Sequence, residues 1–345
     1  MNNDFFQDIR DDNENAVQSE SDSFKESVLI IEKLINGLRN VIKGRDDTIK
    51  LLITALLVDG HVLIEDYPGS GKTTLTKTLG GLINSDLDTN DFSTYKRIQF
   101  TPDMLPGDVL GVTVFDPNSC TFNFKRGPVF ANIVLADEIN RTGPKVQAAF
   151  LECMAEKQVT IDNVTYKLDD LFFVVGTQNP LDMAGTYPLP LVQLDRFLLK
   201  IPMGYVDAET ELTILNEQEA ITQAANNPTP ICSRRDILNA RAEVKNVFIS
   251  TSLRKAIVDI VQSTRNNPLL QFGASTRAAL MLQSALRGWA MINGRSYATS
   301  DDLKYIAPFV LLHRLRFHGA AGEPLEALRN LIAPHLEKLI SEDIR

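Results

Sequence analysis

The chain has 345 residues, of which 44% are hydrophobic and 23% are charged, and its formal net charge is −9. This length favours about two domains over a single core. Because nucleic-acid phosphates bind to basic surfaces, the negative charge argues mildly against a nucleic-acid partner. No stretch approaches the roughly 20 apolar residues of a membrane span.

The polar first residues do not resemble a signal peptide, and the 3 cysteines stand far apart. Their odd number and the absence of a C-x-x-C pair fit reduced thiols better than disulfides or a zinc site. We therefore expect a cytoplasmic protein. The 4 histidines show no metal-ligand spacing, so we expect them to have structural roles.

Three regions follow one another along the chain. Residues 1–24 are acidic and poor in aliphatic side chains, which predicts a mobile tail. From 25 to 204, helical patterns such as 46–59 alternate with short apolar runs, which predicts an α/β domain with a parallel sheet flanked by helices. Residues 205–345 lack β-branched runs and predict an all-helical domain. Serines stand where three of its helices should begin: Ser250, Ser275 and Ser300.

Short apolar runs at 61–65, 133–137 and 171–176 are typical of strands buried on both faces. Alternating patterns around turn residues predict two β-hairpins, at 112–127 and at 159–168.

Residues 65–75, EDYPGSGKTTL, contain most of a phosphate-binding loop. Gly71, Lys72 and Thr73 fit the pattern G-x-x-x-x-G-K-[ST], but Asp66 stands at the position of its first glycine. A predicted strand precedes the loop and a predicted helix follows it, as this kind of loop requires. Its glycines let backbone N–H groups face phosphates, Lys72 can reach the outer phosphates, and Thr73 can place a hydroxyl on Mg²⁺. The alternative is a glycine-rich turn without a ligand.

Polar side chains also end two of the predicted strands. Asp137 and Glu138 close the strand at 133–137, and Asn179 follows the strand at 171–176. At such a strand end the first acid can hold Mg²⁺ through water, and the second can polarise an attacking water. Because ligands gather at the carboxyl ends of parallel strands, these side chains should converge with Lys72. Acids at a strand end can also be merely solvated, but together with the loop they predict a nucleotide site.

The order of several motifs resembles the MoxR family of AAA+ ATPases. The motifs are GSGKT (69–73), LADE (135–138), TQNP (177–180), QLDRF (193–197) and GASTRA (273–278). The resemblance covers about residues 25–340 and leaves out the acidic tail. It implies an AAA+ P-loop core followed by a helical lid, and an aspartate that opens the phosphate loop is familiar in this family. Segments 97–116 and 140–161 also resemble the family, whereas Thr276 replaces a more usual proline.

The resemblance implies roles for single residues. The residues that would contact ATP or ADP, with the first two beside the adenine, are Val41, Ile42, Pro68, Gly69, Ser70, Gly71, Lys72, Thr73 and Thr74. Thr73 and Asp137 would bind Mg²⁺, Glu138 would be the catalytic base, and Asn179 would orient water near the γ-phosphate.

Two arginines complete the implied catalytic set. Arg196 matches the arginine finger that acts on the ATP of a neighbouring subunit, and Arg277 matches the arginine sensor of the lid. Alternatively, Arg196 only pairs with Asp195 or Asp182, and Arg277 caps its own helix. Arg141 either senses phosphate or pairs at the surface.

By resemblance, we expect an ATP-hydrolysing, chaperone-like ring, a hexamer, that remodels or matures a protein complex with a von Willebrand factor A-type partner. The two hairpins would then either project toward the pore of the ring or be surface features without a partner. A nucleic-acid motor and a magnesium-chelatase-like motor subunit are the alternatives. The charge balance weighs against the first alternative, and the second requires dedicated partner chains.

Overall fold

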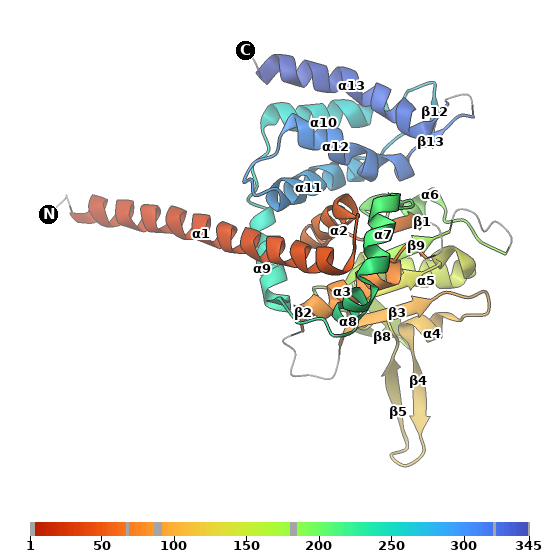
Figure 1. The fold of residues 1–345 in the computed structure, drawn as a ribbon. Helices are drawn as coiled ribbons and strands as arrows, with labels where there is room; N and C mark the ends of the chain where they lie inside the picture. The colour runs from red at the N-terminus through yellow and green to blue at the C-terminus, as the bar shows by residue number, and fades with distance from the viewer. Residues whose placement is uncertain (1–3, 67–68, 86–91, 180–184, 320–321, 344–345) are drawn as a thin grey trace.

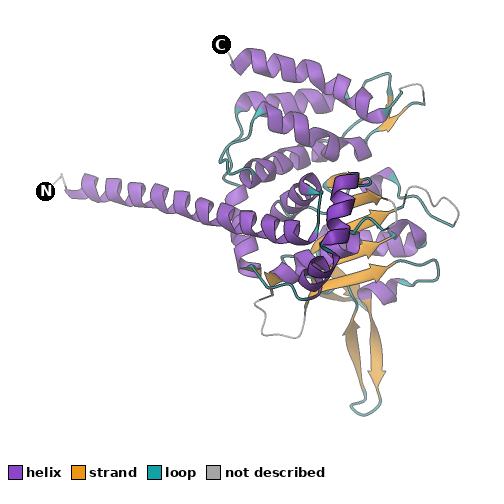
Figure 2. Ribbon diagram, in the orientation of Figure 1, coloured by secondary structure: helices purple, strands orange, loops and turns teal. Residues whose placement is uncertain are grey.

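The computed structural model describes residues 4–66, 69–85, 92–179, 185–319 and 322–343. At its centre lies a five-stranded sheet with the order β10-β1-β9-β6-β3, in which every neighbouring pair of strands is parallel (Figure 2). The strands are β1 (Val62–Asp66), β3 (Ser93–Gln99), β6 (Ala131–Asp137), β9 (Phe173–Gln178) and β10 (Leu199–Met203). The predicted parallel sheet is therefore confirmed, and β3 and β10 are the edge strands that the aliphatic runs did not predict.

Strand residues alternate between two hydrophobic cores, one on each face of the sheet. Val62 and Ile64 of β1 belong to one core, whereas Leu63 belongs to the other. All residues of β6 are buried, because helices cover both faces. Helices on the first face are α1 (Asp4–Val41), α2 (Asp46–Leu57) and α3 (Lys72–Leu82), and the second face packs against α4 (Pro106–Leu110) and α5 (Pro144–Glu156).

The acidic segment that the sequence predicts as a mobile tail has helical backbone from Asp4 onward. It forms the first part of α1, which extends away from the rest of the molecule in Figure 1. From Phe24 the helix packs against the first core, and Ile31, Leu34 and Leu38 are fully buried there. The boundary expected at residue 24 thus falls inside one continuous helix, at the point where its packing begins.

Both predicted hairpins are present. In the first, β4 (Gly111–Asp116) pairs with β5 (Thr121–Arg126), and this hairpin projects from the body of the molecule in Figure 1. In the second, β7 (Gln158–Ile161) pairs with β8 (Val164–Lys167) directly after α5. Short helical turns lie beside the sheet: η1 (Ile139–Arg141), α6 (Leu191–Leu194) and η2 (Leu312–Arg314).

The region after residue 204 contains two groups of helices. In the first group, α7 (Ala208–Asn216) leads into α8 (Gln218–Asn226), which contacts α1 and α3, and α9 (Arg234–Val244) contacts α1 and α2. The second group forms a separate stack in Figure 1: α10 (Thr251–Ser263), α11 (Thr276–Ile292), α12 (Ser300–Leu311) and α13 (Pro324–Asp343).

Short strands interrupt these helices, so the region is mostly rather than entirely helical. Strand β11 (Cys232–Ser233) pairs with β2 (Ile83–Asn84) of the α/β domain, and β12 (Leu270–Phe272) pairs with β13 (Arg316–Phe317).

The helix starts show two correct predictions and one error. Ser250 and Ser275 accept hydrogen bonds from the third residues of their helices, as predicted. At α12 the prediction of Ser300 is wrong, because Thr299 is the N-cap and forms a capping box with Asp302.

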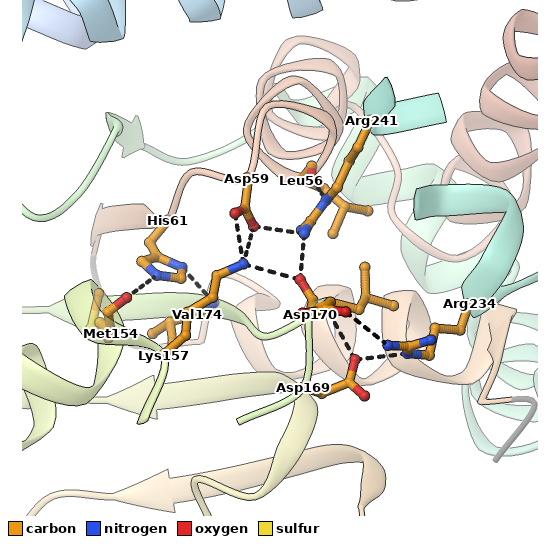
Figure 3. A network of polar contacts seen from close by, with 11 residues as sticks. Leu56, Asp59, His61, Met154, Lys157, Asp169, Asp170, Val174, Arg234 and Arg241 are labelled. Atoms are coloured by element: carbon orange, nitrogen blue, oxygen red, sulfur yellow. Dashed lines mark hydrogen bonds and ion pairs between the residues drawn. The ribbon is translucent and has the colours of Figure 1, made fainter. Parts of the chain in front are cut away.

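A network of ion pairs fastens α9 to the α/β domain (Figure 3). The Nζ of Lys157 lies 2.6 Å from Oδ2 of Asp59, and Nη1 of Arg241 lies 2.6 Å from Oδ1 of the same carboxylate. Both cations also donate to the backbone oxygen of Asp170. Since Lys157 immediately precedes β7, one carboxylate at the end of α2 holds both α9 and the base of the second hairpin.

No helix within the described ranges is long and apolar enough to cross a membrane.

Candidate nucleotide site

The phosphate-binding loop lies at the carboxyl end of β1 and opens into a pocket of about 400 Å³. Gly69 and Gly71 have φ angles of +87° and +94°, which glycine adopts without steric cost. A Cβ atom on either glycine would meet nothing within 4 Å, so the loop curves around open space. The Oγ of Ser70 is buried there without a hydrogen-bond partner among the described residues. These features fit a loop that receives phosphate oxygens.

Most of the predicted site residues line this one pocket. They are Gly69, Ser70, Gly71, Lys72, Thr73, Thr74, Asp137, Glu138 and Asn179. They come from the loop after β1, the end of β6 and the end of β9, which are neighbours in the sheet. The convergence follows from strand order, because parallel strands place their carboxyl ends at the same edge.

Asp137 is held by partners from both neighbouring strands. Its Oδ1 accepts a hydrogen bond of 2.7 Å from the Thr177 hydroxyl, and its Oδ2 lies 2.6 Å from Nη2 of Arg97. Thr177 belongs to β9 and Arg97 to β3, so the carboxylate is fixed from two sides. Neither partner is predicted from the sequence, because only the register of the sheet brings them beside Asp137.

Glu138 follows in a left-handed conformation, with φ 57° and ψ 48°. Such angles are uncommon for a residue with a side chain and occur often at functional sites. Its backbone N–H donates to the Thr177 hydroxyl at 2.9 Å, which stabilises this turn. Its Oε2 accepts from Nε2 of Gln99 at 2.8 Å and lies 3.2 Å from Nε of Arg141. Arg141 therefore forms an ion pair with the predicted base while its own side chain stays 41% exposed, which is a pairing of the kind that its second alternative described. Its phosphate-sensing role stays a prediction.

The donor set at this edge fits Mg²⁺. Mg²⁺ prefers oxygen ligands and is typically held by one or two protein groups together with substrate phosphates. Asp137 supplies a carboxylate and Thr73 a hydroxyl in the same pocket. Among the described residues no group of three or more His, Cys, Asp or Glu side chains could hold a metal by itself. Mg²⁺ at this site would take its further ligands from nucleotide phosphates and water.

The structure does not bring Arg196 and Arg277 into the phosphate pocket. Both line a second pocket of about 440 Å³, together with Asp59, His61 and Lys157. Leu198, two residues after Arg196, donates its N–H to the backbone oxygen of His61 at 2.7 Å, and His61 immediately precedes β1. Arg196 thus lies at the amino edge of the sheet and the phosphate loop at the carboxyl edge. The five residues of β1 separate these edges, which corresponds to roughly 16 Å of strand.

The two arginines differ in their contacts. The Nε of Arg277 lies 3.8 Å from Oδ2 of Asp195, whose Oδ1 accepts a hydrogen bond of 2.8 Å from Nε of the buried Arg314. Arg277 therefore pairs with a carboxylate and does not cap its own helix, which Ser275 caps. The Arg196 guanidinium forms no hydrogen bond or ion pair within the residues that the structure describes, and Asp182 lies outside them.

Two other predicted contacts, Val41 and Ile42, do not line the pocket. They are buried in the first core at the end of α1, with 5% and 8% of their surface exposed. Their contact with adenine remains a prediction. Pro68 lies outside the described residues.

Sequence comparisons agree with this fold and site. Residues 61–199 match the model of the ATPase family associated with various cellular activities (AAA), and residues 262–331 match an AAA lid domain. The chain is 37% identical over 294 residues to Chaperone MoxR1 of Mycobacterium tuberculosis, covering 83% of this chain and 75% of that protein. It is 44% identical over 292 residues to the uncharacterized protein YeaC of Bacillus subtilis, covering 85% of this chain and 88% of that one.

A solved structure has the same architecture. The crystal structure of a proposed ATPase from Cytophaga hutchinsonii superposes with a TM-score of 0.84 at 36% identity, over 93% of this chain and 98% of that one. Fold and site together define an ATP-hydrolysing P-loop enzyme with a helical lid. The chain belongs to the MoxR family of AAA+ ATPases.

Proposed function

We propose that this protein is a ring-forming ATPase in which each nucleotide site is completed by an arginine from the neighbouring copy. The observation that carries the proposal is the placement of Arg196. It lies at the opposite edge of the sheet from the phosphate loop, and its guanidinium has no partner in the described part of the chain. Arg277 shares this edge, so both arginines would face the nucleotide of the adjoining copy.

Within one copy, the phosphate pocket would bind the nucleotide and activate water. Lys72 and the N–H groups of residues 69–74 would contact the phosphates, and Thr73 and Asp137 would hold Mg²⁺. The bound Mg²⁺ would neutralise negative charge on the β- and γ-phosphates. Asn179 would orient the attacking water, and Glu138 would take its proton. Within the described ranges, the contacts to the Glu138 carboxylate use Oε2, which leaves Oε1 as the acceptor.

A site completed between copies makes ATP turnover depend on assembly. Specific activity should rise steeply with protein concentration as rings form, and we propose a hexamer. Sedimentation velocity with and without ATP, run beside a turnover assay over the same dilution series, tests this. A constant specific activity across the series would contradict a shared site.

We further propose a chaperone-like action on a protein complex in the cytoplasm, together with a von Willebrand factor A-type partner. The name of the relative Chaperone MoxR1 supports the chaperone role. Glu138→Gln protein should retain ATP and its client together, so trapping that variant in an extract of the native cell would identify the client.

A protein client also implies that nucleic acid is not the partner. The net charge is −9, and the sequence has no dense run of Lys and Arg along which a phosphate backbone could bind. ATP turnover should therefore be unchanged by single- or double-stranded DNA or by RNA. A several-fold acceleration by DNA that disappears as salt rises would favour a nucleic-acid motor instead.

A further inference from the structure

The β4–β5 hairpin is an ordered projection. Six residue pairs join its strands, from Gly111 opposite Arg126 to Asp116 opposite Thr121. At the tip, Asp116 accepts hydrogen bonds of 2.9 Å from the N–H of Asn118 and from the Ser119 hydroxyl. These bonds lower the pKa of the Asp116 carboxyl and define the turn. The tip is therefore a structured element rather than an irregular loop.

One face of this hairpin carries a row of aromatic rings that begins in the core. Phe124 lies 5.7 Å from the buried Phe130, measured between ring centroids, and stacks on Tyr166 of β8 at 4.1 Å. Nearer the tip, Phe115 and Phe122 face each other across the strands with centroids 5.1 Å apart. The inner rings thus anchor the hairpin to the body and to the second hairpin.

The outer end of the row is exposed. Phe122 exposes 73% of its surface and Phe115 exposes 48%. On the opposite face, Val112 and Val114 are also exposed. The inner rings already secure the base of the hairpin, so the outer ones add little to folding while presenting apolar surface to water. Clustered exposure of this kind on a protein surface usually marks an interaction site.

The hairpin also offers unpaired backbone. In the part of the chain that the structure describes, β4 and β5 pair only with each other, so each strand has one free edge. A free edge presents N–H and C=O groups to which an extended peptide can add as a further strand. The side chains of an added strand alternate between faces, and every second one would lie against the aromatic face.

We propose that the β4–β5 hairpin binds an extended segment of the client polypeptide by strand addition, with alternate apolar side chains of that segment against Phe115 and Phe122. This inference rests on the proposed action on a protein client and names the surface that contacts it. Single-stranded nucleic acid could also stack on exposed rings, but it would need cations along the strand. The hairpin offers Lys125 and Arg126, and the Arg126 guanidinium already lies 5.3 Å from the ring centroids of Phe92 and Phe130.

Fluorescence anisotropy of the full chain with two labelled peptides tests the proposal. The first probe alternates valine and threonine between terminal lysines. The second has the same sequence with N-methylated amides, which cannot donate backbone hydrogen bonds. We expect the first probe to bind at least about tenfold more tightly than the second, and Phe122→Thr to weaken its binding by about tenfold, because an apolar contact is lost. Phe122→Tyr should restore most of the affinity.

Phe272→Thr is the matched control, because Phe272 exposes 59% of its surface in β12, far from the hairpin in the fold. It should bind the first probe within about twofold of the unaltered chain. Equal binding of both peptides, or no effect of Phe122→Thr, would overturn the proposal. Loss of assembly in Phe122→Thr would also overturn it, because the hairpin would then be a contact between copies. Displacement of the probe by oligothymidine at physiological salt would overturn it as well. ATP turnover of the same samples reports separately on the nucleotide site, since peptide binding is measured without nucleotide.

Discussion

The guanidinium of Arg97 contacts the carboxylate of Asp137, with Nη2 2.6 Å and Nε 3.1 Å from Oδ2. Asp137 is the residue expected to hold Mg²⁺, and its other oxygen accepts from the Thr177 hydroxyl. Both carboxylate oxygens are therefore engaged by the protein itself. A metal that approaches Asp137 has to compete with a positive charge already in place.

Removing that charge should favour metal binding. In Arg97→Gln, the Mg²⁺ concentration that half-saturates binding of a fluorescent ADP should fall about fivefold, the equivalent of about 1 kcal/mol for a partly exposed ion pair. A Mg²⁺ titration of the fluorescence measures this. Lys96→Gln, the preceding residue of β3 and exposed like Arg97, is the control and should leave the titration unchanged. Weaker ADP binding by Arg97→Gln at all Mg²⁺ concentrations would instead make Arg97 a phosphate contact.

Binding and hydrolysis should separate between two variants of the phosphate pocket. Lys72→Ala should lose most affinity for ATP, because the lysine supplies positive charge at the phosphates. Glu138→Gln keeps the shape of the pocket and should bind ATP well but hydrolyse it roughly 10²- to 10⁴-fold more slowly, as expected for loss of a general base. Equilibrium binding and single-turnover assays measure the two effects. Normal turnover by Glu138→Gln would remove it from the catalytic role.

Arg196→Ala should bind ATP nearly normally and hydrolyse it about 10³- to 10⁵-fold more slowly, the cost of removing an arginine finger in other phosphoryl-transfer enzymes. Mixing it with Lys72→Ala should restore part of the activity, since an intact phosphate pocket can then meet an intact Arg196 at some interfaces. Turnover is measured across mixing ratios, with Arg316→Ala, an exposed residue of β13, as a control that needs no rescue. No recovery at any ratio would contradict a site shared between copies.

His61 should make stability depend on pH. Burial lowers its pKa from 6.5 to about 4, and its Nδ1 accepts a hydrogen bond from the N–H of Val174 that protonation would break. Between about pH 6.5 and about pH 4, His61 binds a proton in the unfolded chain but not in the folded chain. The free energy of unfolding should therefore fall as pH drops from about 6.5 to about 4, by up to about 3 kcal/mol from this group.

Denaturant unfolding at several pH values, compared between the unaltered chain and His61→Asn, isolates this contribution. Burial also lowers the pKa of His313, and that residue remains in both proteins, so its effect cancels in the comparison. The slope of stability against pH should be shallower in the variant throughout this window. Identical slopes would show that His61 does not resist protonation in the folded chain.

Local patterns predicted the elements of this fold better than their contacts. The phosphate loop, both hairpins and the strand ending at Asp137 follow from residues adjacent in sequence. Arg97 and Gln99 lie far from Asp137 and Glu138 in the chain, and only the pairing of β3 with β6 brings them together. No short-range pattern encodes that register. The left-handed turn at Glu138 was likewise invisible, because the residue is not a glycine.

The error at α12 and the helical form of residues 4–24 have different origins. Thr299 and Ser300 are both good N-caps, and the choice between them depends on Asp302, which sits three residues after Thr299 and completes its capping box. For residues 4–24, composition excluded burial but did not exclude a helix that continues outward from a packed segment. The position of Arg277 beside Asp195 could not be predicted either, because it depends on how α11 packs against the α/β domain.

If Arg196 completes the site of a neighbouring copy, its separation from the phosphate loop by the length of β1 also restricts how copies can associate. A contact that joins the carboxyl edge of one sheet to the amino edge of the next is heterologous, since the two surfaces differ. A row of such contacts that stays open leaves one unmatched loop and one unmatched arginine at its two ends, whereas closure matches every loop. Each copy added to an open row would thus create one interface that pairs a phosphate loop with an Arg196. Closure of the ring would create one more such interface without a further copy.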